Sequence, residues 1–560
     1  MDVATFIRHW QSEDDVSYRF DVRDWIQKSY SNPLSFWEDL ASLYPIEPPS
    51  QTVPLQKYDF YADCILRHLG KKNIALKVIH SKTEADAWTY EQIHGFVNAQ
   101  APLWKLKAGQ SVALVLPPGL PFLVGLLTAL RLGLVISILP FNDRFFPPSQ
   151  LQPALEQLKP ALVVTTPEVE LDFKGQILSL DLSLQKQSST PPPTHAYLPN
   201  EIVLQHFNPF AEEKMSPLEA MRCYLIPLRD ALIALQLTTS TTWARPLSSL
   251  FREEPCCTLM ALLAGSTLVH VADNVLLSQP DILKDEPIDI LGICPLLQNL
   301  WMKHPSLPVS KLKLWYRNPL CGTDQNWKAF HQLNKLQKIP CCQLLIDKER
   351  GGITLFSQPK PLQVSFLHPS LGMSWSLLKI NRSGDKALGG FGLFHIEPDS
   401  GQPDPFIISQ VGDEWTLSAT TVPLREGYPF PLKIIEEKVK ALPFALTCMV
   451  VTEPHPHHYH NRQFVLLVFV SPKERLSLAQ KQEDWNQKIL HLIQTEVGTA
   501  FVPEQIQFYS LYPKMKNQQI DRNSVEMQAQ NGSLFLKQNR SVYHTLNLLR
   551  QLIYETLATK

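Results

Sequence analysis

The sequence predicts an α/β protein in which a large domain of parallel and mixed sheets, covered by helices, precedes a small α+β lobe. Over the first two thirds of the chain, short apolar runs alternate with stretches of helical period, the order that builds parallel sheets. Near the C-terminus, a helix over 432–442, strands over 447–452 and 463–470 and a long helix over 478–495 predict the lobe. A chain of 560 residues is long enough for both.

The clearest strand–helix–strand unit lies between Trp88 and Pro140. Thr89 is a suitable N-cap for an amphipathic helix, and the apolar run Val112–Leu116 predicts a buried strand. Two prolines and a glycine end this strand, after which a helix over 122–132 and a second strand over 134–139 are expected. A transmembrane span is the alternative, because one charge, Arg131, lies between 119 and 140. The prolines and the short segments favour a buried sheet.

Charge and cysteine content limit the partners and the compartment. The chain has 52 Lys and Arg against 53 Asp and Glu, so no bias toward nucleic acid or an anionic membrane is visible. None of the nine cysteines forms a Cys-x-x-Cys pair, and the segment after Met1 lacks the layout of a signal peptide, which predicts a cytoplasmic protein. Glycine is scarce, at 22 of 560 residues, although nucleotide sites usually need glycine where backbone N–H groups approach phosphate.

Several motifs follow one another along the chain: WTYEQ at 88–92, RLG at 131–133, IDKERGGI at 346–353, GYPFPLKIIE at 427–436 and YPKMKNQQIDR at 512–522. They resemble motifs of the AMP-forming acyl-CoA synthetases, the adenylate-forming (AMP-binding) superfamily. The pair Phe36-Trp37, followed by an entry helix, is similar to the acetyl-CoA synthetase branch of that family. The resemblance implies an N-terminal extension at 1–60, a large AMP-binding-like domain at 61–424, a small C-terminal lobe at 425–525 and a helical tail at 526–560.

The family's phosphate-binding loop, T-S-G-T-T-G-x-P-K-G, is not found where the resemblance places it. A strand is expected over 201–207, but it leads into NPFAEEK, and no glycine lies between Gly175 and Gly265. The nearest match, TTSTTW at 238–243, lacks both glycines and the lysine. We expect it to be a core strand whose hydroxyls have no special role.

Other nucleotide-binding motifs are also changed. Val411-Gly412-Asp413 is expected to be a hairpin turn and not the ribose-binding motif, and the hinge motif G-R-x-D-D aligns with a stretch around Ser418 and Thr420. In the last motif, Pro513, Lys514, Ile520, Asp521 and Arg522 match the family pattern. This register places Gln519 at the position of the catalytic lysine, so the sequence offers no confident catalytic residue.

Glu349 is the best surviving functional candidate. On the resemblance it occupies the position of a glutamate that helps to bind magnesium and nucleotide, with Gly351 and Gly352 kept and Lys348 in place of a threonine. The alternative, which the loss of the other ligands favours, is a Lys-Glu-Arg triplet on the surface before a hairpin.

Two further features have no assigned role. Four histidines, His455, His457, His458 and His460, could bind a transition metal, but no acid or cysteine completes a set of ligands, and a polar hairpin tip is favoured over a metal site. The tail carries an apolar helical stripe, Leu546 to Ile553, which predicts docking on the protein's own body or on a partner.

The missing nucleotide-binding motifs bear directly on whether the protein can form an acyl-adenylate. Removing one preorganised donor typically costs about 3 kcal/mol of transition-state stabilisation, and several such losses approach roughly 8 kcal/mol, the low end of what enzymes supply. The sequence therefore predicts a catalytically degenerate homologue, a pseudoenzyme without a cofactor that binds a protein partner or an acyl ligand. The alternative is an active AMP-forming acyl-CoA or acyl-carrier ligase with a remodelled site for ATP and magnesium, using Glu349 with Lys514 and Lys516. A third hypothesis is an interaction subunit that docks through its tail.

Overall fold

The computed structural model describes Ser29, Phe36, Trp37 and most of residues 57–527. Within that range the description leaves out 142, 184–190, 212–213, 306–310, 321–323, 358–366, 373, 379–390, 398–405, 412–413, 421–422, 456–457, 510–514, 517–518, 523 and 526. Most of the predicted extension and almost all of the predicted tail lie outside the described residues. The chain forms two compact units, the first ending at Tyr428 and the second beginning at Pro429.

The first unit contains a sheet of six strands among its described residues, in the order β6-β5-β3-β4-β7-β8. Its strands are β3 (Ser111–Val115), β4 (Val135–Ile138), β5 (Leu162–Thr165), β6 (Gln176–Ser179), β7 (Ile202–Phe207) and β8 (Met215–Glu219). β3 is parallel to β4 and β5, while β7 and β8 form an antiparallel hairpin at one edge. The predicted strand–helix–strand unit is therefore confirmed, with β3, α6 (Leu120–Leu132) and β4.

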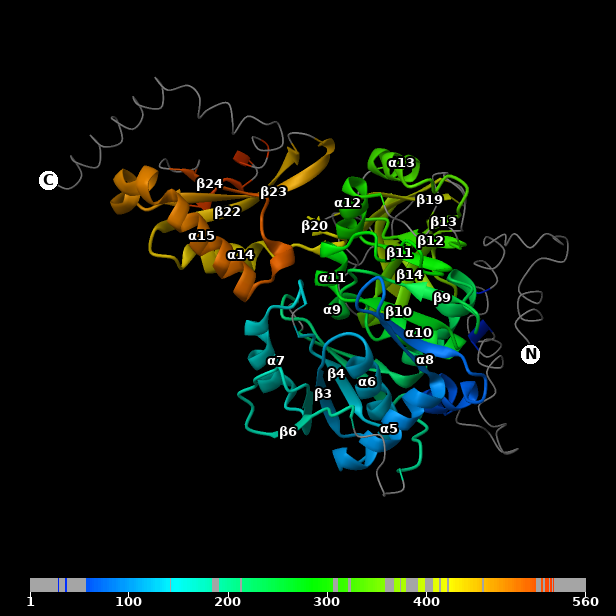
Figure 1. The fold of residues 1–560 in the computed structure, drawn as a ribbon. Helices are drawn as coiled ribbons and strands as arrows, with labels where there is room; N and C mark the ends of the chain where they lie inside the picture. The colour runs from blue at the N-terminus through cyan, green and yellow to red at the C-terminus, as the bar shows by residue number, and fades with distance from the viewer. Residues whose placement is uncertain are drawn as a thin grey trace. The chain divides into compact units, whose positions relative to one another are not determined.

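A larger sheet of thirteen described strands completes the first unit (Figure 1). Its parallel part runs through β1 (Ile74–Ile79), β10 (Thr267–Val271), β9 (Thr242–Ala244), β11 (Ile290–Ile293), β12 (Leu314–Arg317) and β13 (Cys341–Asp347). Antiparallel strands extend it at both ends: β2 (Ala85–Thr89), β14 (Gly352–Ser357), β15 (Leu367–Pro369), β16 (Ser374–Leu378), β17 (Phe391–Glu397), β18 (Phe406–Val411) and β19 (Glu414–Thr420). β18 and β19 are antiparallel, with Val411 opposite Glu414, while the predicted hairpin turn at Gly412-Asp413 lies outside the described residues.

Helices and short turns connect these strands. The helices of the first unit are α4 (Phe60–Cys64), α5 (Tyr90–Trp104), α6, α7 (Leu151–Leu158), α8 (Ala220–Arg229), α9 (Leu250–Glu253), α10 (Cys256–Ala264), α11 (Asp273–Ser278), α12 (Pro295–Lys303) and α13 (Asp324–Leu333). Shorter turns are η1 (Leu66–His68), η2 (Pro148–Gln150), η3 (Asp230–Ala234) and η4 (Lys348–Arg350), and a small pair of strands, β20 (Leu424–Arg425) and β21 (Tyr428–Pro429), ends the unit.

Local signals explain where α5 and α6 begin and end. The Thr89 side chain accepts a hydrogen bond from the Gln92 N–H, and the Gln92 side chain accepts one from the Thr89 N–H, which completes a capping box. Gly133, at φ +73°, ends α6 in the left-handed conformation that glycine adopts without strain.

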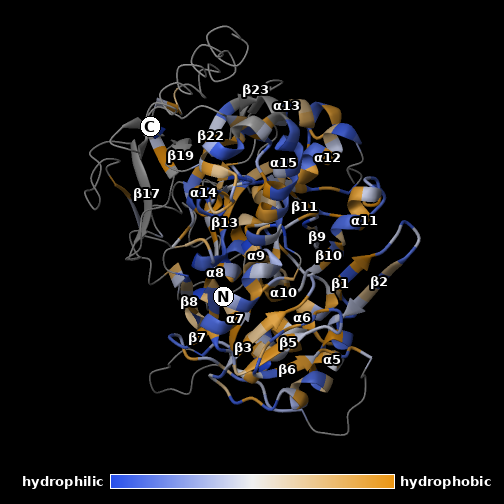
Figure 2. Cartoon of the chain, turned by 90° about the vertical axis from the view of Figure 1, so that its left-hand side faces the viewer, coloured by the Kyte–Doolittle hydropathy of each residue, from blue (hydrophilic) through white to orange (hydrophobic). Residues whose placement is uncertain are grey.

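α6 is buried almost all round, and it is largely orange in the hydropathy colouring of Figure 2. Its one charge, Arg131, is satisfied inside the protein. The guanidinium donates to Asn98 Oδ1 at 2.6 Å and to the Pro192 carbonyl, and it lies 4.9 Å from the centre of the Tyr61 ring. Among the described residues, no helix combines the length and apolar character needed to cross a membrane.

In its described residues, the second unit contains a small sheet and two helices. It contains α14 (Leu432–Lys440), β22 (Ala445–His455), β23 (His458–Val470), α15 (Leu478–Glu496), β24 (Gln505–Tyr509), β25 (Met515–Lys516) and β26 (Gln519–Ile520), with turns η5 (Pro472–Ser477) and η6 (Thr499–Phe501). β22 and β23 are antiparallel, and β23 is parallel to β24. The predicted α+β lobe is therefore confirmed. His455 ends β22 and is paired with His458, which begins β23, so the histidine-rich stretch lies where these two antiparallel strands meet. The side chains of this tip lie outside the described residues.

The prediction of a core strand over TTSTTW is wrong for its first four residues. β9 begins only at Thr242. Before it, the Thr238 N–H donates to Thr241 Oγ1 at 3.0 Å, and the Thr238 hydroxyl lies 3.0 Å from the hydroxyls of Ser240 and Thr241. The hydroxyls that interrupt the apolar pattern close a turn, because serine and threonine side chains compete with a strand for backbone N–H groups.

Candidate functional site

A cavity of about 1040 Å³ lies at the carboxyl ends of parallel strands of both sheets in the first unit. Its walls come from the segments that follow β3, β5, β6, β9 and β10, and they include Pro117, Glu168, Asp181, Arg245 and Asp273. Ligands of open α/β sheets bind in the crevice outside the strand carboxyl ends. The size of the cavity suits a small molecule.

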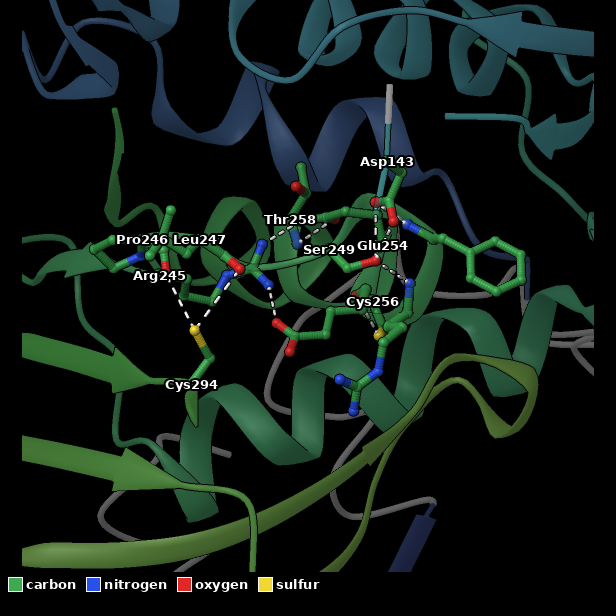
Figure 3. Close-up of polar contacts among 12 residues, drawn as sticks. Asp143, Arg245, Pro246, Leu247, Ser249, Glu254, Cys256, Thr258 and Cys294 are labelled. Carbon is green, nitrogen blue, oxygen red and sulfur yellow. Dashed lines mark hydrogen bonds and ion pairs between the residues drawn. The ribbon is translucent and has the colours of Figure 1, made fainter. Parts of the chain in front are cut away.

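The lining of the cavity includes members of an ion-pair network around Arg245, drawn in Figure 3. The Arg245 guanidinium donates to Glu253 Oε2 at 2.7 Å and also to Glu254. Glu254 in turn accepts a hydrogen bond from the Thr258 N–H at 3.1 Å. Burial alone would lower the pKa of Arg245, but Cys257, Glu254 and Glu253 raise it well above its ordinary value, so the guanidinium stays charged.

Asp143 holds the segment that follows β9 against the segment that follows β4. Its carboxylate accepts hydrogen bonds from the Ser249 hydroxyl at 2.9 and 2.8 Å, from the Phe145 N–H at 2.9 Å and from the Phe251 N–H at 3.2 Å (Figure 3). Ser249 is also the N-cap of α9. On the other side, the Cys294 thiol lies 3.7 Å from the Leu247 carbonyl oxygen. This wall of the cavity is therefore fixed by several independent contacts.

A second ion pair closes the wall near the end of the first unit. Arg144 donates to both carboxylate oxygens of Glu426, at 2.9 and 3.2 Å. Because this pair is bidentate and mostly buried, neither charge is available to a ligand in this arrangement.

Glu349 lies outside this cavity, in η4 between β13 and β14. The expectation of an exposed Lys-Glu-Arg triplet is wrong, because Lys348 is 7% exposed and its Nζ lies 3.8 Å from the centre of the Phe251 ring. The triplet follows β13 at the point where the chain turns back into the buried strand β14. Lys348 is buried there, and Glu349 and Arg350 are half-buried, although all three residues are charged.

The Glu349 carboxylate is hydrogen-bonded to the segment that follows β7. Asn208 Nδ2 donates to Glu349 Oε1 at 3.1 Å, and Asn208 Oδ1 accepts from the Tyr428 hydroxyl, also at 3.1 Å. Burial and the neighbouring Asp347 raise the pKa of Glu349, against lowering contributions from Lys348 and the Asn208 hydrogen bond. The carboxylate is thus held in a protein network in which its ionised form is disfavoured.

Asn208 is the first residue of NPFAEEK, at the place where the resemblance puts the phosphate-binding loop. The Asn208 N–H donates to the Lys214 carbonyl at 2.9 Å, so the segment closes the β7–β8 hairpin. No glycine lies in 208–214 to bring backbone N–H groups close to a phosphate.

Gln519 lies in the second unit, on β26, which pairs with β25. Its side chain lies outside the described residues, and its assignment to the family's lysine position stays a prediction. No group of three or more metal-ligating side chains is found in the part of the chain that the structure describes.

Sequence reasoning did not single out the residues that line the cavity. Asp143, Arg245, Thr258 and His270 lie in different segments, and none belongs to a recognised motif. A general signal was available for Asp143 and Arg245, because each follows a predicted strand, and ligand sites of α/β folds form where strands end.

Comparison with known proteins identifies the fold. No protein-family model matches the chain, and no curated protein matches it by sequence. Solved structures do match. An artificially fused adenylation–PCP didomain of a nonribosomal peptide synthetase, NpsA-ThdA from Klebsiella oxytoca, superposes with a TM-score of 0.62 at 13% identity, covering 80% of this chain and 93% of that chain. The amide bond synthetase McbA from Marinactinospora thermotolerans superposes with a TM-score of 0.64 at 14% identity, and the match covers 83% of this chain and 99% of that chain. The chain has the two-part adenylate-forming fold that the sequence motifs predicted.

Proposed function

We propose that this protein is a pseudoenzyme with the adenylate-forming fold, which forms no adenylate and acts by binding an acyl ligand or a protein partner. The observation that carries the proposal is the hydrogen bond from Asn208 to Glu349. It joins the one carboxylate that the resemblance assigns to magnesium and nucleotide to the segment that should have been the phosphate-binding loop.

The physical reason is a mismatch with the needs of magnesium and phosphate. Mg²⁺ in nucleotide sites is held by ionised carboxylates and by the phosphates themselves. Burial and Asp347 raise the pKa of Glu349, which opposes the ionised form. A phosphate group also needs a cradle of N–H donors, and a hairpin connection without glycine is poorly suited to provide one.

The cavity supports an acyl ligand. Its volume is about 1040 Å³, and its walls include many apolar side chains, among them Phe122, Leu180, Leu250 and Leu268. A ligand with an apolar chain would bury this surface, at about 25 cal/mol for each Å² removed from water.

The alternative is an active AMP-forming ligase with a remodelled site that uses ATP and magnesium. Both similar structures are described as adenylation or synthetase proteins, and one of them includes a PCP domain. By analogy, an acyl-carrier protein would be a partner of this chain under the alternative. Lys514 and Lys516, with Glu349, would then replace the missing donors.

Calorimetric titration separates the two hypotheses. Purified protein is titrated with ATP and magnesium and, in parallel, with a non-hydrolysable acyl-adenylate analogue, while AMP release is assayed. A pseudoenzyme gives no heat with ATP and magnesium and releases no AMP, whereas heat with the acyl-adenylate analogue alone would indicate that the acyl group is bound. Micromolar binding of ATP, with AMP release that Glu349→Ala abolishes, would establish the ligase instead.

The third hypothesis, an interaction subunit, concerns the tail, which lies outside the described residues. If the tail is the docking element, truncation after Asn531 should dissociate a stable oligomer or complex. A full-length protein that is a monodisperse monomer and retains no partner would rule this hypothesis out. We place the protein in the cytoplasm under all three hypotheses.

A further inference from the structure

The sheet of the second unit is apolar on both faces. β23 contains the uninterrupted apolar run 464–470, which is typical of a strand buried on both sides. One face packs against the two helices. The Cys448 thiol donates to the Glu436 carbonyl of α14 at 3.1 Å, and the ring of Phe508 on β24 lies 6.1 Å from the Trp485 ring of α15. The opposite face therefore needs a cover of its own.

This opposite face carries a continuous apolar cluster. Strand pairing brings its members to one side of the sheet, because residues directly opposite one another share a face. The members on β22 and β23 are between 0% and 6% exposed: Met449, Val451, Val465, Leu467 and Phe469. Among the described residues outside the sheet, Val525 alone joins the cluster. One valine is too small to keep water from five large side chains.

The C-terminal tail starts beside this face. The Arg522 guanidinium donates to the Glu436 carboxylate of α14 at 2.6 Å, and Val525, three residues later, belongs to the apolar cluster. Residues 528–560 follow and lie outside the described residues. The stretch from 528 to Leu546 can extend over roughly 60 Å, whereas β23, with 13 residues, is about 43 Å long. The tail is therefore long enough to reach any part of the face.

Glu453 and Gln463 extend this face toward the end of the β22–β23 hairpin. They lie opposite one another, two residues beyond the opposed pair Val451 and Val465, and they are 1% and 2% exposed. Neither carboxylate oxygen of Glu453 has a hydrogen-bond partner among the described residues, and nor does Gln463 Nε2. Burial raises the pKa of Glu453 to about 7, as expected for a carboxylate without a counter-charge. A cation placed here would offset the cost of burying it.

The apolar stripe of the tail carries one charge of the required sign. On a helix, Leu546, Leu549 and Ile553 fall on one face, because they are three or four residues apart. Arg550 follows Leu546 by four residues and precedes Ile553 by three, so it shares that face. It is the one charged residue between Leu546 and Ile553. The stripe thus matches an apolar sheet face that contains a buried carboxylate.

We propose that the tail folds back as a helix onto this face of the second unit, where its stripe covers the apolar cluster and Arg550 pairs with Glu453. The occupant is this chain's own tail, because the tail begins beside the face, is long enough to cross it and carries the complementary charge. This inference goes beyond the proposed function, and it holds for a pseudoenzyme and for an active ligase alike.

Hydrogen exchange of the full-length protein at pH 8, followed by mass spectrometry, tests the docking. The backbone amides of 546–553 should exchange more slowly than those of a synthetic peptide with the sequence of 540–560. Leu549→Asp should remove this protection. Leu548→Asp is the matched control on the opposite side of the helix, and it should keep the protection. Exchange of 546–553 in the native protein as fast as in the peptide would overturn the docking.

Arg550→Gln and Glu453→Gln test the ion pair by the same measurement. Each should lower the protection of 546–553 about tenfold, the loss expected for one hydrogen bond to a charged group. The double variant should lose no more than either single variant, because both remove the same interaction. Arg540→Gln removes a tail arginine outside the stripe and should change nothing. Losses that multiply in the double variant would overturn the pairing of Arg550 with Glu453.

The concentration dependence of the exchange separates this chain's own tail from that of a second copy. Protection of 546–553 should be the same at every protein concentration, because the contact forms within one chain. Protection that appears only as sedimentation detects a dimer would overturn docking within one chain and would assign the face to the tail of a second copy.

Discussion

Gly352, the second glycine after Glu349, has a packing role that is independent of any nucleotide. A methyl group on Gly352 would lie 2.3 Å from Asp230 Oδ2 and 2.8 Å from Ile226 Cγ2. Asp230 cannot move away easily, since it accepts the Ile353 N–H at 2.6 Å and is paired with Arg229 at 2.6 Å. A motif glycine can therefore persist for the fold alone, which is one reason that a family motif is weak support for activity.

Gly352→Ala should destabilise the protein by about 1–3 kcal/mol, because the added methyl group overpacks a fixed ion pair. Gly95→Ala is the control, since Gly95 lies inside α5 with no atom within 4 Å of the added Cβ. It should stabilise by about 0.5–1 kcal/mol through helix propensity. Urea unfolding measures both, and equal effects would contradict the packing argument.

Glu349 should give the protein a pH-dependent stability. Its pKa is raised in the folded state, so the folded protein binds more protons than the unfolded chain between the ordinary and the raised pKa. The contribution of Glu349 to the free energy of unfolding must therefore fall as pH rises through that interval.

Glu349→Gln removes this titration and can still accept the Asn208 hydrogen bond. The difference in free energy of unfolding between native protein and variant should favour the variant progressively as pH rises above about 4.5, the ordinary range of a glutamate. Chemical denaturation at several pH values measures this difference. If the free energy of unfolding of the variant is lower by the same amount at every pH, then the titration of Glu349 makes no contribution to stability.

At the scale of elements, α5 shows how local signals set a boundary. Thr89 and Gln92 exchange hydrogen bonds in a capping box, and both residues can be read from the sequence. The stretch from Thr238 to Thr241 could not be predicted in the same way. Its hydroxyls close a turn, and the strand β9 begins only at Thr242.

Thr89→Ala should lower the free energy of unfolding by about 1 kcal/mol, because the Gln92 N–H loses its acceptor. Thr89→Ser keeps the hydroxyl and should lose little. Thermal or urea unfolding of the two variants compares them directly, and equal losses would mean that the methyl group of Thr89, and not its hydroxyl, stabilises this helix end.

At the scale of the whole molecule, two compact units carry separate cores. Leu262 belongs to the core of the first unit and Leu467 to a core cluster of the second, and both are fully buried. Chains of this kind often unfold in more than one step.

Calorimetric unfolding should accordingly show two transitions. Leu262→Ala and Leu467→Ala should each lower one transition by about 2–5 kcal/mol and leave the other nearly unchanged. A single transition that both variants shift equally would mean that the units unfold together.

The sequence by itself determined the α/β order, the strand–helix–strand unit around β3 and the small lobe, because hydrophobic period and capping residues are local properties. The sequence motifs also led to the adenylate-forming fold. Only the tertiary structure decided the environment of Glu349, since burial raises its pKa and its carboxylate accepts a hydrogen bond from Asn208, which lies 141 positions away in the chain. The cavity was likewise invisible to local patterns. Gly119 and His270 lie close together there only because parallel strands from two sheets end at the same place, and strand alignment is a property of the folded chain.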